Sequence, residues 1–187
     1  MDNYKKNLKL LTENHVYSEE MEHDACGVGL IASTEGKKSR AVVEYGIEAL
    51  KAVWHRGAID ADGKTGDGAG IHVEIPKDFF IEKIEVTGHD YDKSEICVGM
   101  IFLPRNDYAS QEACKTIVES ELTKNDFSIY GWRQVPVNPK VLGEKAKSTM
   151  PEIIQVLFKS NDPKLLEKNL ERKIYETRKK IENKAFE

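Results

Sequence analysis

Apolar and polar residues along the first half of the chain are arranged in a pattern that predicts one helix between two strands. The apolar run at 28–32 predicts a buried strand, and the strict alternation at 71–75 predicts a half-buried one. Between them, Ser39 can cap a helix, and Gly57 is placed to end that helix in the left-handed conformation. The apolar positions of this helix recur every three or four residues: Val43, Ile47, Leu50 and Trp54.

The second half continues with alternating helices and strands. In chain order these are a short helix at 76–80, a strand at 96–103, a helix at 108–124 and strands at 127–137 and 153–158. Asp162 and Pro163 form a good cap and first-turn pair, so we expect a last, charged helix to begin there. The helix at 108–124 should turn Ala113, Ile117 and Val118 inward. The apolar stripe of the last helix is formed by Leu166, Leu170, Ile174, Thr177 and Ile181.

Composition narrows the class of protein. The 187 residues are 40% hydrophobic, which is enough for one domain with a real core. A net charge of -4 without basic blocks argues against a nucleic-acid partner. No apolar run is long enough for a signal peptide or a membrane span, and the three cysteines form no CxxC pair. We therefore expect a soluble cytoplasmic protein without a membrane partner, preceded by a polar leader over the first 22 residues.

Cys26 stands at the head of the first apolar run. Cleavage of the Ala25–Cys26 bond would give this residue a free α-amine beside its thiol. The thiol has a pKa near ~8.5 and the amine one near ~7.7–8.0, so the amine could accept the thiol proton at neutral pH. Taken alone, Cys26 fits the commoner role of a buried cysteine at the start of a core strand better.

Two further motifs have structural and functional interpretations. The glycine cluster at 66–70 is followed by a strand rather than a helix, which excludes a dinucleotide or phosphate loop and leaves a tight turn. Asp60 and Asp62 resemble the start of a calcium loop, but Lys64 occupies a ligand position. Arg56 either offsets the dipole of a helix end, which is the modestly favoured interpretation, or lies beside a reactive site, and its spacing alone does not decide between the two. The histidines lack ligand spacing, so no metal site is expected.

The order of the motifs resembles a known family. They run from about Val16 to the end of the chain, and together they resemble the glutaminase domain of glutamate synthase large subunits, which is a class II glutamine amidotransferase. The segments concerned are 23–29 (HDACGVG), 55–58 (HRGA), 65–71 (TGDGAGI), 75–76 (IP), 102–104 (FLP), 132–136 (WRQVP), 155–158 (QVLF), 171–175 (ERKIY) and 178–182 (RKKIE).

This resemblance implies an α+β fold of the N-terminal-nucleophile hydrolase class, a four-layer αββα sandwich of which about the first half is present. Residues 1–25 would be a pro-segment and residues 26–187 the N-terminal part of the amidotransferase domain. Cys26 would attack the side-chain amide of L-glutamine and release ammonia and then glutamate. Arg56 would hold the nucleophile in place, and Gly27, Gly66, Asp67 and Gly68 would shape the substrate site.

The resemblance also implies partners outside this segment. In the complete enzyme ammonia would reach 2-oxoglutarate, with FMN and an iron–sulfur cluster supplying electrons. A small subunit carrying FAD and NADPH, or ferredoxin, would be the donor. The Arg-Phe-Ser-Thr and Asn-Gly segments that complete the family's site are not found here. We therefore expect an N-terminal fragment that is nearly inert by itself.

Two alternatives remain open from the residues. Other class II amidotransferases share a cysteine followed by glycine and use a different ammonia acceptor, although the turn at 65–70 and the strand motif at 132–136 argue against them. The chain could also be a non-catalytic module that uses the fold for assembly.

Overall fold

The structure is a computed structural model that describes residues 27–53, 57–66, 68–91, 95–162, 164–165 and 167–186, with residues 6, 9–10 and 12–13. The chain divides into two compact units. The first consists of Met1–Ala58 and Asp67–Ile71, and the second of Ile59–Gly66 and His72–Glu187.

The first unit contains helix α2, Arg40–Ala52. Its predicted cap is confirmed, because the Ser39 hydroxyl accepts a hydrogen bond from the amide of Ala41 at 3.2 Å. The prediction for Gly57 is wrong, because the helix ends at Ala52 and Gly57 has no positive φ. The last turn closes at Val53, whose N–H bonds to the carbonyl of Lys51, so no left-handed glycine is needed there. Trp54 lies outside the described residues.

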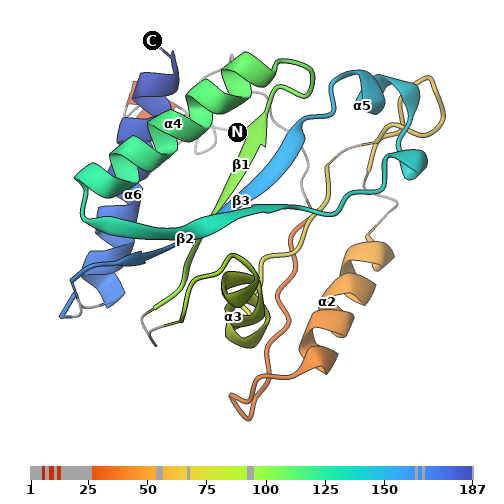
Figure 1. Cartoon of the computed structure of the whole chain (residues 1–187). Helices are drawn as coiled ribbons and strands as arrows, with labels where there is room; N and C mark the ends of the chain where they lie inside the picture. The colour runs from red at the N-terminus through yellow and green to blue at the C-terminus, as the bar shows by residue number, and fades with distance from the viewer. Residues whose placement is uncertain are drawn as a thin grey trace. The chain divides into compact units, whose positions relative to one another are not determined.

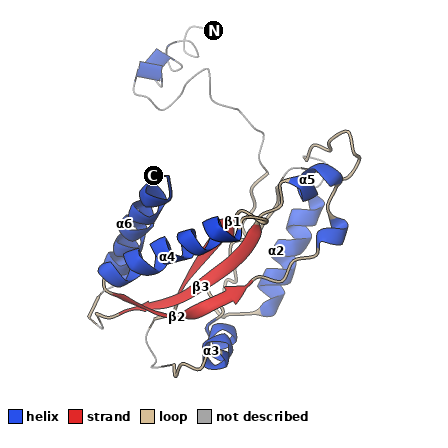
Figure 2. Cartoon of the chain, turned by 45° about the horizontal axis from the view of Figure 1, so that its top comes forward, coloured by secondary structure: helices blue, strands red, loops and turns tan. Residues whose placement is uncertain are grey.

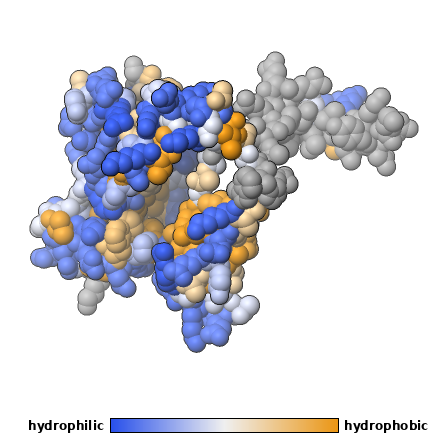
Figure 3. Space-filling model, turned by 90° about the vertical axis from the view of Figure 1, so that its right-hand side faces the viewer, coloured by the Kyte–Doolittle hydropathy of each residue, from blue (hydrophilic) through white to orange (hydrophobic). Residues whose placement is uncertain are grey.

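The strands predicted at 28–32 and 71–75 are not formed, and both predictions are wrong for the described chain. Val28 and Leu30 are 93% and 89% exposed, and Ile71 and Val73 are exposed as well. A strand needs a hydrogen-bonding neighbour, and neither segment has one among the described residues. Apolar patches of this kind interrupt the hydrophilic surface seen in Figure 3. The apolar pattern alone therefore did not produce a strand in either segment.

The second unit is built on a three-stranded antiparallel sheet in the order β1-β3-β2 (Figure 1). Its strands are β1 (Cys97–Leu103), β2 (Phe127–Gln134) and β3 (Glu152–Ser160). All three were predicted, with end shifts of one to three residues. Strand β2 stops at Gln134, before its predicted end, because Pro136 has no N–H to donate to the neighbouring strand. Its register with β3 shifts at a bulge between Ile129 and Gly131.

Helices α4 (Tyr108–Lys124) and α6 (Glu167–Phe186) cover one face of this sheet (Figure 2). The bounds of α4 are as predicted, but Ala113 is exposed rather than inward. The buried face of α4 includes Gln111. Ala113 is two positions further along the helix and therefore points to another side. The core of this layer is formed by Cys97, Val118, Leu122, Phe127, Val156, Phe158 and Leu170.

The start of α6 also differs from the prediction. The Asp162 carboxylate accepts a hydrogen bond from the amide of Lys164 at 2.9 Å, and the carbonyl of Asp162 bonds to Leu165. Asp162 therefore closes a local turn, and the helix begins at Glu167. Within the helix Leu170 and Thr177 are buried and Ile174 and Ile181 half-buried, whereas Leu166 lies outside the described residues. The predicted stripe is confirmed at these four positions.

Helix α3, Lys77–Val86, lies on the opposite face. It runs six residues past the predicted end at Phe80, because Ile84 packs into the same buried cluster as Phe80. That cluster also contains Ile96, Tyr130 and Leu157. Farther along the same face of β1, Met100 is 49% and Phe102 63% exposed. Two short helices, η2 (Pro139–Val141) and α5 (Glu144–Ser148), connect β2 to β3.

Candidate functional site

Three of the predicted site residues, Cys26, Arg56 and Asp67, lie outside the described residues. Their roles stay predictions. Gly27, Gly66 and Gly68 are described, and they belong to different units. Gly27 and Gly68 fall in the first unit and Gly66 in the second, so each is considered where it lies.

Gly27 lies against the end of helix α2. A Cβ on Gly27 would stand 3.7 Å from both Cβ and Cγ2 of Val53, which is ordinary van der Waals contact. Val53 is the C-cap of α2. The residue that follows Cys26 in the sequence therefore contacts the helix end that precedes Arg56.

Gly68 lies in open space. No heavy atom among the described residues, other than its chain neighbours, comes within 4 Å of the position its Cβ would occupy. Its φ is not positive either. Neither protein packing nor backbone conformation thus accounts for glycine here.

Gly66 closes a loop of the second unit. Ile59 and Gly66 form an isolated antiparallel bridge, and inside it the amide of Asp60 donates to the carbonyl of Thr65 at 2.7 Å. Gly63 has φ +67°, a conformation that glycine adopts without the Cβ clash, and its N–H bonds to the carbonyl of Asp60. The loop is a closed turn that ends at the first residue of the glycine cluster.

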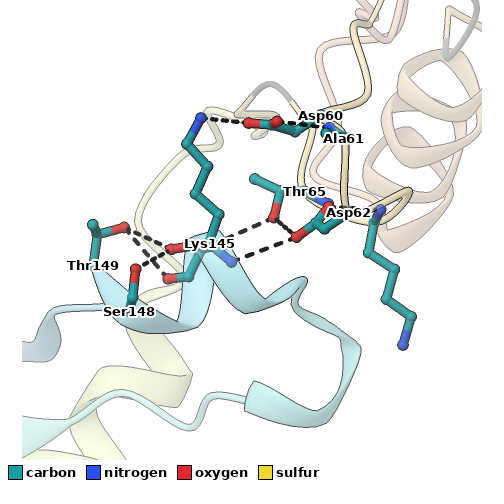
Figure 4. A network of polar contacts seen from close by, with 9 residues as sticks. Asp60, Ala61, Asp62, Thr65, Lys145, Ser148 and Thr149 are labelled. Carbon is teal, nitrogen blue, oxygen red and sulfur yellow. Dashed lines mark hydrogen bonds and ion pairs between the residues drawn. The ribbon is translucent and has the colours of Figure 1, made fainter.

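The Asp62 carboxylate holds the inside of this loop together (Figure 4). One oxygen accepts from the amides of Lys64 at 2.9 Å and Thr65 at 2.7 Å, and the other from the hydroxyl of Thr65 at 2.6 Å. These hydrogen bonds, the Thr65 hydroxyl foremost, hold the pKa of Asp62 well below its usual range. Asp62 is therefore ionised at neutral pH.

The same loop is attached to helix α5. The second Asp62 oxygen also accepts from the amide of Lys145 at 3.4 Å, and the Lys145 ammonium pairs with Asp60 at 2.5 Å (Figure 4). This pairing lowers the pKa of Asp60 and raises that of Lys145. Gly143, directly before the helix, is buried against Thr65, and a Cβ there would overlap Asp62 and Thr65. We call Asp60, Asp62, Thr65, Gly143 and Lys145 the loop clamp.

The sequence did not reveal the loop clamp. Asp60 and Asp62 were compared with a calcium loop, whereas the structure directs both carboxylates at amides, a hydroxyl and an ammonium. The pattern Asp62-x-x-Thr65 is typical of a side chain that caps its own turn, and it was the available signal. Among the described residues no group of three or more His, Cys, Asp or Glu side chains is arranged to hold a metal ion.

The other cysteines differ in their surroundings. Cys97 is buried in the sheet core, and burial raises the pKa of its thiol to about 12. Cys114 is half-buried on α4. Cys97 is therefore a packing residue of the core cluster. Across the described ranges, no helix is both long and apolar enough to cross a membrane.

Comparison with known proteins identifies the family. Residues 26–187 match the model of the class-II glutamine amidotransferases. The chain is 51% identical over 179 residues to the glutamate synthase [NADPH] large chain of Azospirillum brasilense, covering 96% of this chain and 12% of that protein. It is 41% identical over 162 residues to ferredoxin-dependent glutamate synthase 1 of Arabidopsis thaliana, covering 86% of this chain and 10% of that protein.

A relative from spinach is similar over a comparable share of each chain. The chain is 38% identical to the ferredoxin-dependent glutamate synthase of Spinacia oleracea, over 88% of this chain and 10% of that protein. The chain thus spans only about a tenth of the length of these relatives. Because the family match covers most of its length, this chain belongs to the class-II glutamine amidotransferases.

Proposed function

We propose that this chain carries the nucleophile of the glutamine-hydrolysing domain of a glutamate synthase. The observation that supports this is the packing of Gly27 against Val53, which brings the residue after Cys26 to the helix end before Arg56. The sequence identity to glutamate synthases extends over 86–96% of the chain. It favours a glutamate synthase over amidotransferases that pass ammonia to a different acceptor. Residues 1–25 are a pro-segment, and 26–187 form part of the amidotransferase domain.

The reaction begins at the Cys26 thiol once the Ala25–Cys26 bond is cleaved. The α-amine takes the thiol proton, and the thiolate attacks the side-chain amide carbon of glutamine. The C–N bond then breaks, and the leaving nitrogen takes the proton from the α-ammonium and departs as ammonia. A water molecule attacks the γ-glutamyl thioester, which releases glutamate and restores the thiol. No redox step is needed at this site.

The remaining site residues hold the reactants. Arg56 orients the nucleophile, and Gly27 shapes the site beside it. Gly66, Asp67 and Gly68 shape the substrate site.

The fold proposed for the complete domain is the four-layer αββα sandwich. The sheet of the second unit has helices α4 and α6 on one face, while Met100 and Phe102 are exposed on the other. A second sheet would cover these side chains. The apolar segments 28–32 and 71–75, which have no strand partners among the described residues, could contribute to it.

The complete enzyme would pass ammonia to 2-oxoglutarate, with electrons from FMN and an iron–sulfur cluster. A small subunit with FAD and NADPH, or ferredoxin, would supply them in the cytoplasm. The described residues offer no cluster of ligands for an iron–sulfur group, and Cys97 is a buried thiol with a raised pKa. We therefore place the cofactors outside this segment.

The experiment is glutamine hydrolysis by the full-length protein, preceded by N-terminal sequencing. We expect a processed chain that begins at Cys26, and Cys26→Ala should abolish ammonia release from glutamine. Cys114→Ala is the matched control and should retain activity, because Cys114 lies on α4. Unchanged hydrolysis by Cys26→Ala would show that the proposed function is wrong.

A further inference from the structure

We propose that a cleft beside helix α4 binds a small organic anion that bears a flat ring with an N–H donor, which is the chemistry of a purine nucleotide. All residues that line this cleft belong to the second unit. Its volume is about 600 Å³, within the range of small-molecule sites. The inference goes beyond the proposed function and does not depend on it.

The cleft lies between the first half of α4 and the ends of two strands. Gln111 and Lys115 line it from α4. Trp132 lines it from the end of β2 and Glu152 from the start of β3, which is paired with β2. Arg105 lines it from the loop that joins β1 to α4. Because α4 packs on this sheet, the walls of the cleft are in place before any ligand binds.

The side chain of Gln111 is the strongest sign of a ligand. It is 7% exposed, and its Nε2 donates to the carbonyls of Pro104 at 2.6 Å and Arg105 at 3.2 Å. Its Oε1 accepts no hydrogen bond from the described residues. No fully buried side-chain nitrogen or oxygen of the described chain lacks a partner, so this oxygen must be accessible where Gln111 lines the cleft. It is therefore an acceptor for a ligand that supplies an N–H or O–H.

Two cationic side chains face the cleft without strong partners in the protein. Arg105 has no carboxylate within ion-pair distance among the described residues, and its guanidinium contacts only the Met150 sulfur at 3.9 Å. Lys115 pairs with Glu112 at 2.8 Å, but the Glu112 side chain is 72% exposed, so this pair is weak. Both cations can therefore bind an anionic group of a ligand.

The other charged side chains that line the cleft are already engaged. The Glu152 carboxylate accepts a hydrogen bond from the side-chain amide of Gln134 at 2.5 Å. The Arg133 guanidinium donates to the side-chain oxygen of Gln155 at 2.6 Å. Arg105 and Lys115 therefore decide the sign of the ligand, although the chain as a whole carries a net charge of -4.

Trp132 gives the cleft a flat apolar wall. Its indole N–H donates to the Glu119 carboxylate at 2.7 Å, which fixes the ring and leaves its carbon surface for the cleft. Aromatic side chains stack on planar rings such as nucleobases. A purine nucleotide combines such a ring, an N–H donor for Gln111 and an anionic group for Arg105 and Lys115.

The test is equilibrium dialysis of adenosine 5′-monophosphate (AMP) with the full-length protein. We expect saturable binding of AMP. Adenosine and ribose 5-phosphate should bind at least about tenfold more weakly, because each lacks one of the groups that the cleft recognises. Arg105→Ala and Lys115→Ala should each weaken AMP binding about tenfold, which corresponds to the loss of one hydrogen bond to a charged group.

Arg172→Ala is the matched control. Arg172 is exposed on α6, where it pairs with Glu176 at 2.8 Å, so its removal should leave AMP binding unchanged. Melting temperatures of all variants separate a lost binding group from a loss of folding. Arg105 is exposed and Lys115 half-buried, so neither substitution removes a core side chain, and either variant decides if the other fails to fold.

Three results would overturn the proposal. The first is the absence of saturable AMP binding. The second is equal AMP affinity in Arg105→Ala and Arg172→Ala, which would assign the nucleotide to another site of the full-length protein. The third is ribose 5-phosphate binding as tightly as AMP, because an anion alone would then explain the binding. Weaker AMP binding in both cleft variants, at unchanged melting temperature, would support it.

Discussion

The amide nitrogen of Thr65 lies 2.6 Å from the position that a Cβ of Gly143 would occupy. A real Cβ does not approach a backbone atom so closely, so Gly143→Ala must push the loop at 59–66 away from helix α5. We expect a loss of about 1–3 kcal/mol in the free energy of unfolding, as for other overpacked sites. Denaturant unfolding followed by circular dichroism would measure it.

Gly46→Ala is the control for that change. Gly46 lies inside α2 with nothing within 4 Å of its Cβ position among the described residues, so alanine should stabilise the helix by about 0.5–1 kcal/mol. Equal effects of the two substitutions would contradict the close approach at Gly143.

Glu121 should make stability depend on pH in the acid range. Its side chain is 5% exposed, and hydrogen bonds from Lys184 and then Lys124 hold the pKa of its carboxyl below the usual value. A carboxyl with a lowered pKa in the folded state adds stability that is fully present above its unfolded pKa, near ~4.3, and is lost as the pH falls through the folded pKa. Wild type should therefore exceed Glu121→Gln in stability at pH 7, and the difference should vanish in acid.

Unfolding midpoints of both proteins between pH 2 and pH 7 would test this. Glu112→Gln serves as control, because Glu112 forms an exposed pair with Lys115 on the same helix. Its effect at pH 7 should stay within about 0.5 kcal/mol. A difference for Glu121→Gln that grew toward low pH would contradict the assigned direction.

The three thiols should react at different rates with iodoacetamide. Burial raises the pKa of the Cys97 thiol to about 12, so very little of it is ionised at pH 8. We expect Cys26 of the processed protein to be labelled first, half-buried Cys114 next, and Cys97 only after unfolding. Peptide mass mapping over time would give the order. Equal labelling of Cys97 and Cys114 in the folded protein would refute it.

Phe102 tests the four-layer fold. It is 63% exposed here, and a substitution at a site that stays exposed changes stability by no more than about 0.5 kcal/mol. Under a second sheet, Phe102→Ala in the full-length protein should cost about 3 kcal/mol or more. Tyr108→Ala, at 77% exposure on α4, is the matched aromatic control. A Phe102 effect no larger than the control would argue against the sandwich.

The elements of the second unit were predictable because their patterns are local. Helix α4 begins and ends at the predicted residues, and the three strands follow from runs of apolar residues. The predictions that were wrong concern strand pairing, which needs a distant partner, and helix capping, which depends on the hydrogen bonds that the cap residue forms. Residues 71–75 alternate as a strand should, but alternation does not supply a hydrogen-bonding partner. Asp162 is a residue type that commonly caps helices, but here its carboxylate closes a turn before the helix begins.

The candidate site was predictable only in part, for a similar reason. The motifs around Cys26 and Arg56 are short and contiguous, and they led to the family that the comparisons confirm. The loop clamp joins Asp60 and Asp62 to Lys145, more than eighty residues away. No local pattern specifies such a contact, although Asp62-x-x-Thr65 did indicate a capped turn.

The strand order has a consequence for synthesis on the ribosome. The central strand, β3, is the last of the three to be made, so β1 and β2 have no partner until Glu152–Ser160 emerges. At about 5–20 residues per second, the interval between finishing β1 and starting β3 is roughly 2–10 s. During that time the apolar side chains of β1 are uncovered in the nascent chain. Chaperone binding to this segment should therefore end when β3 is complete.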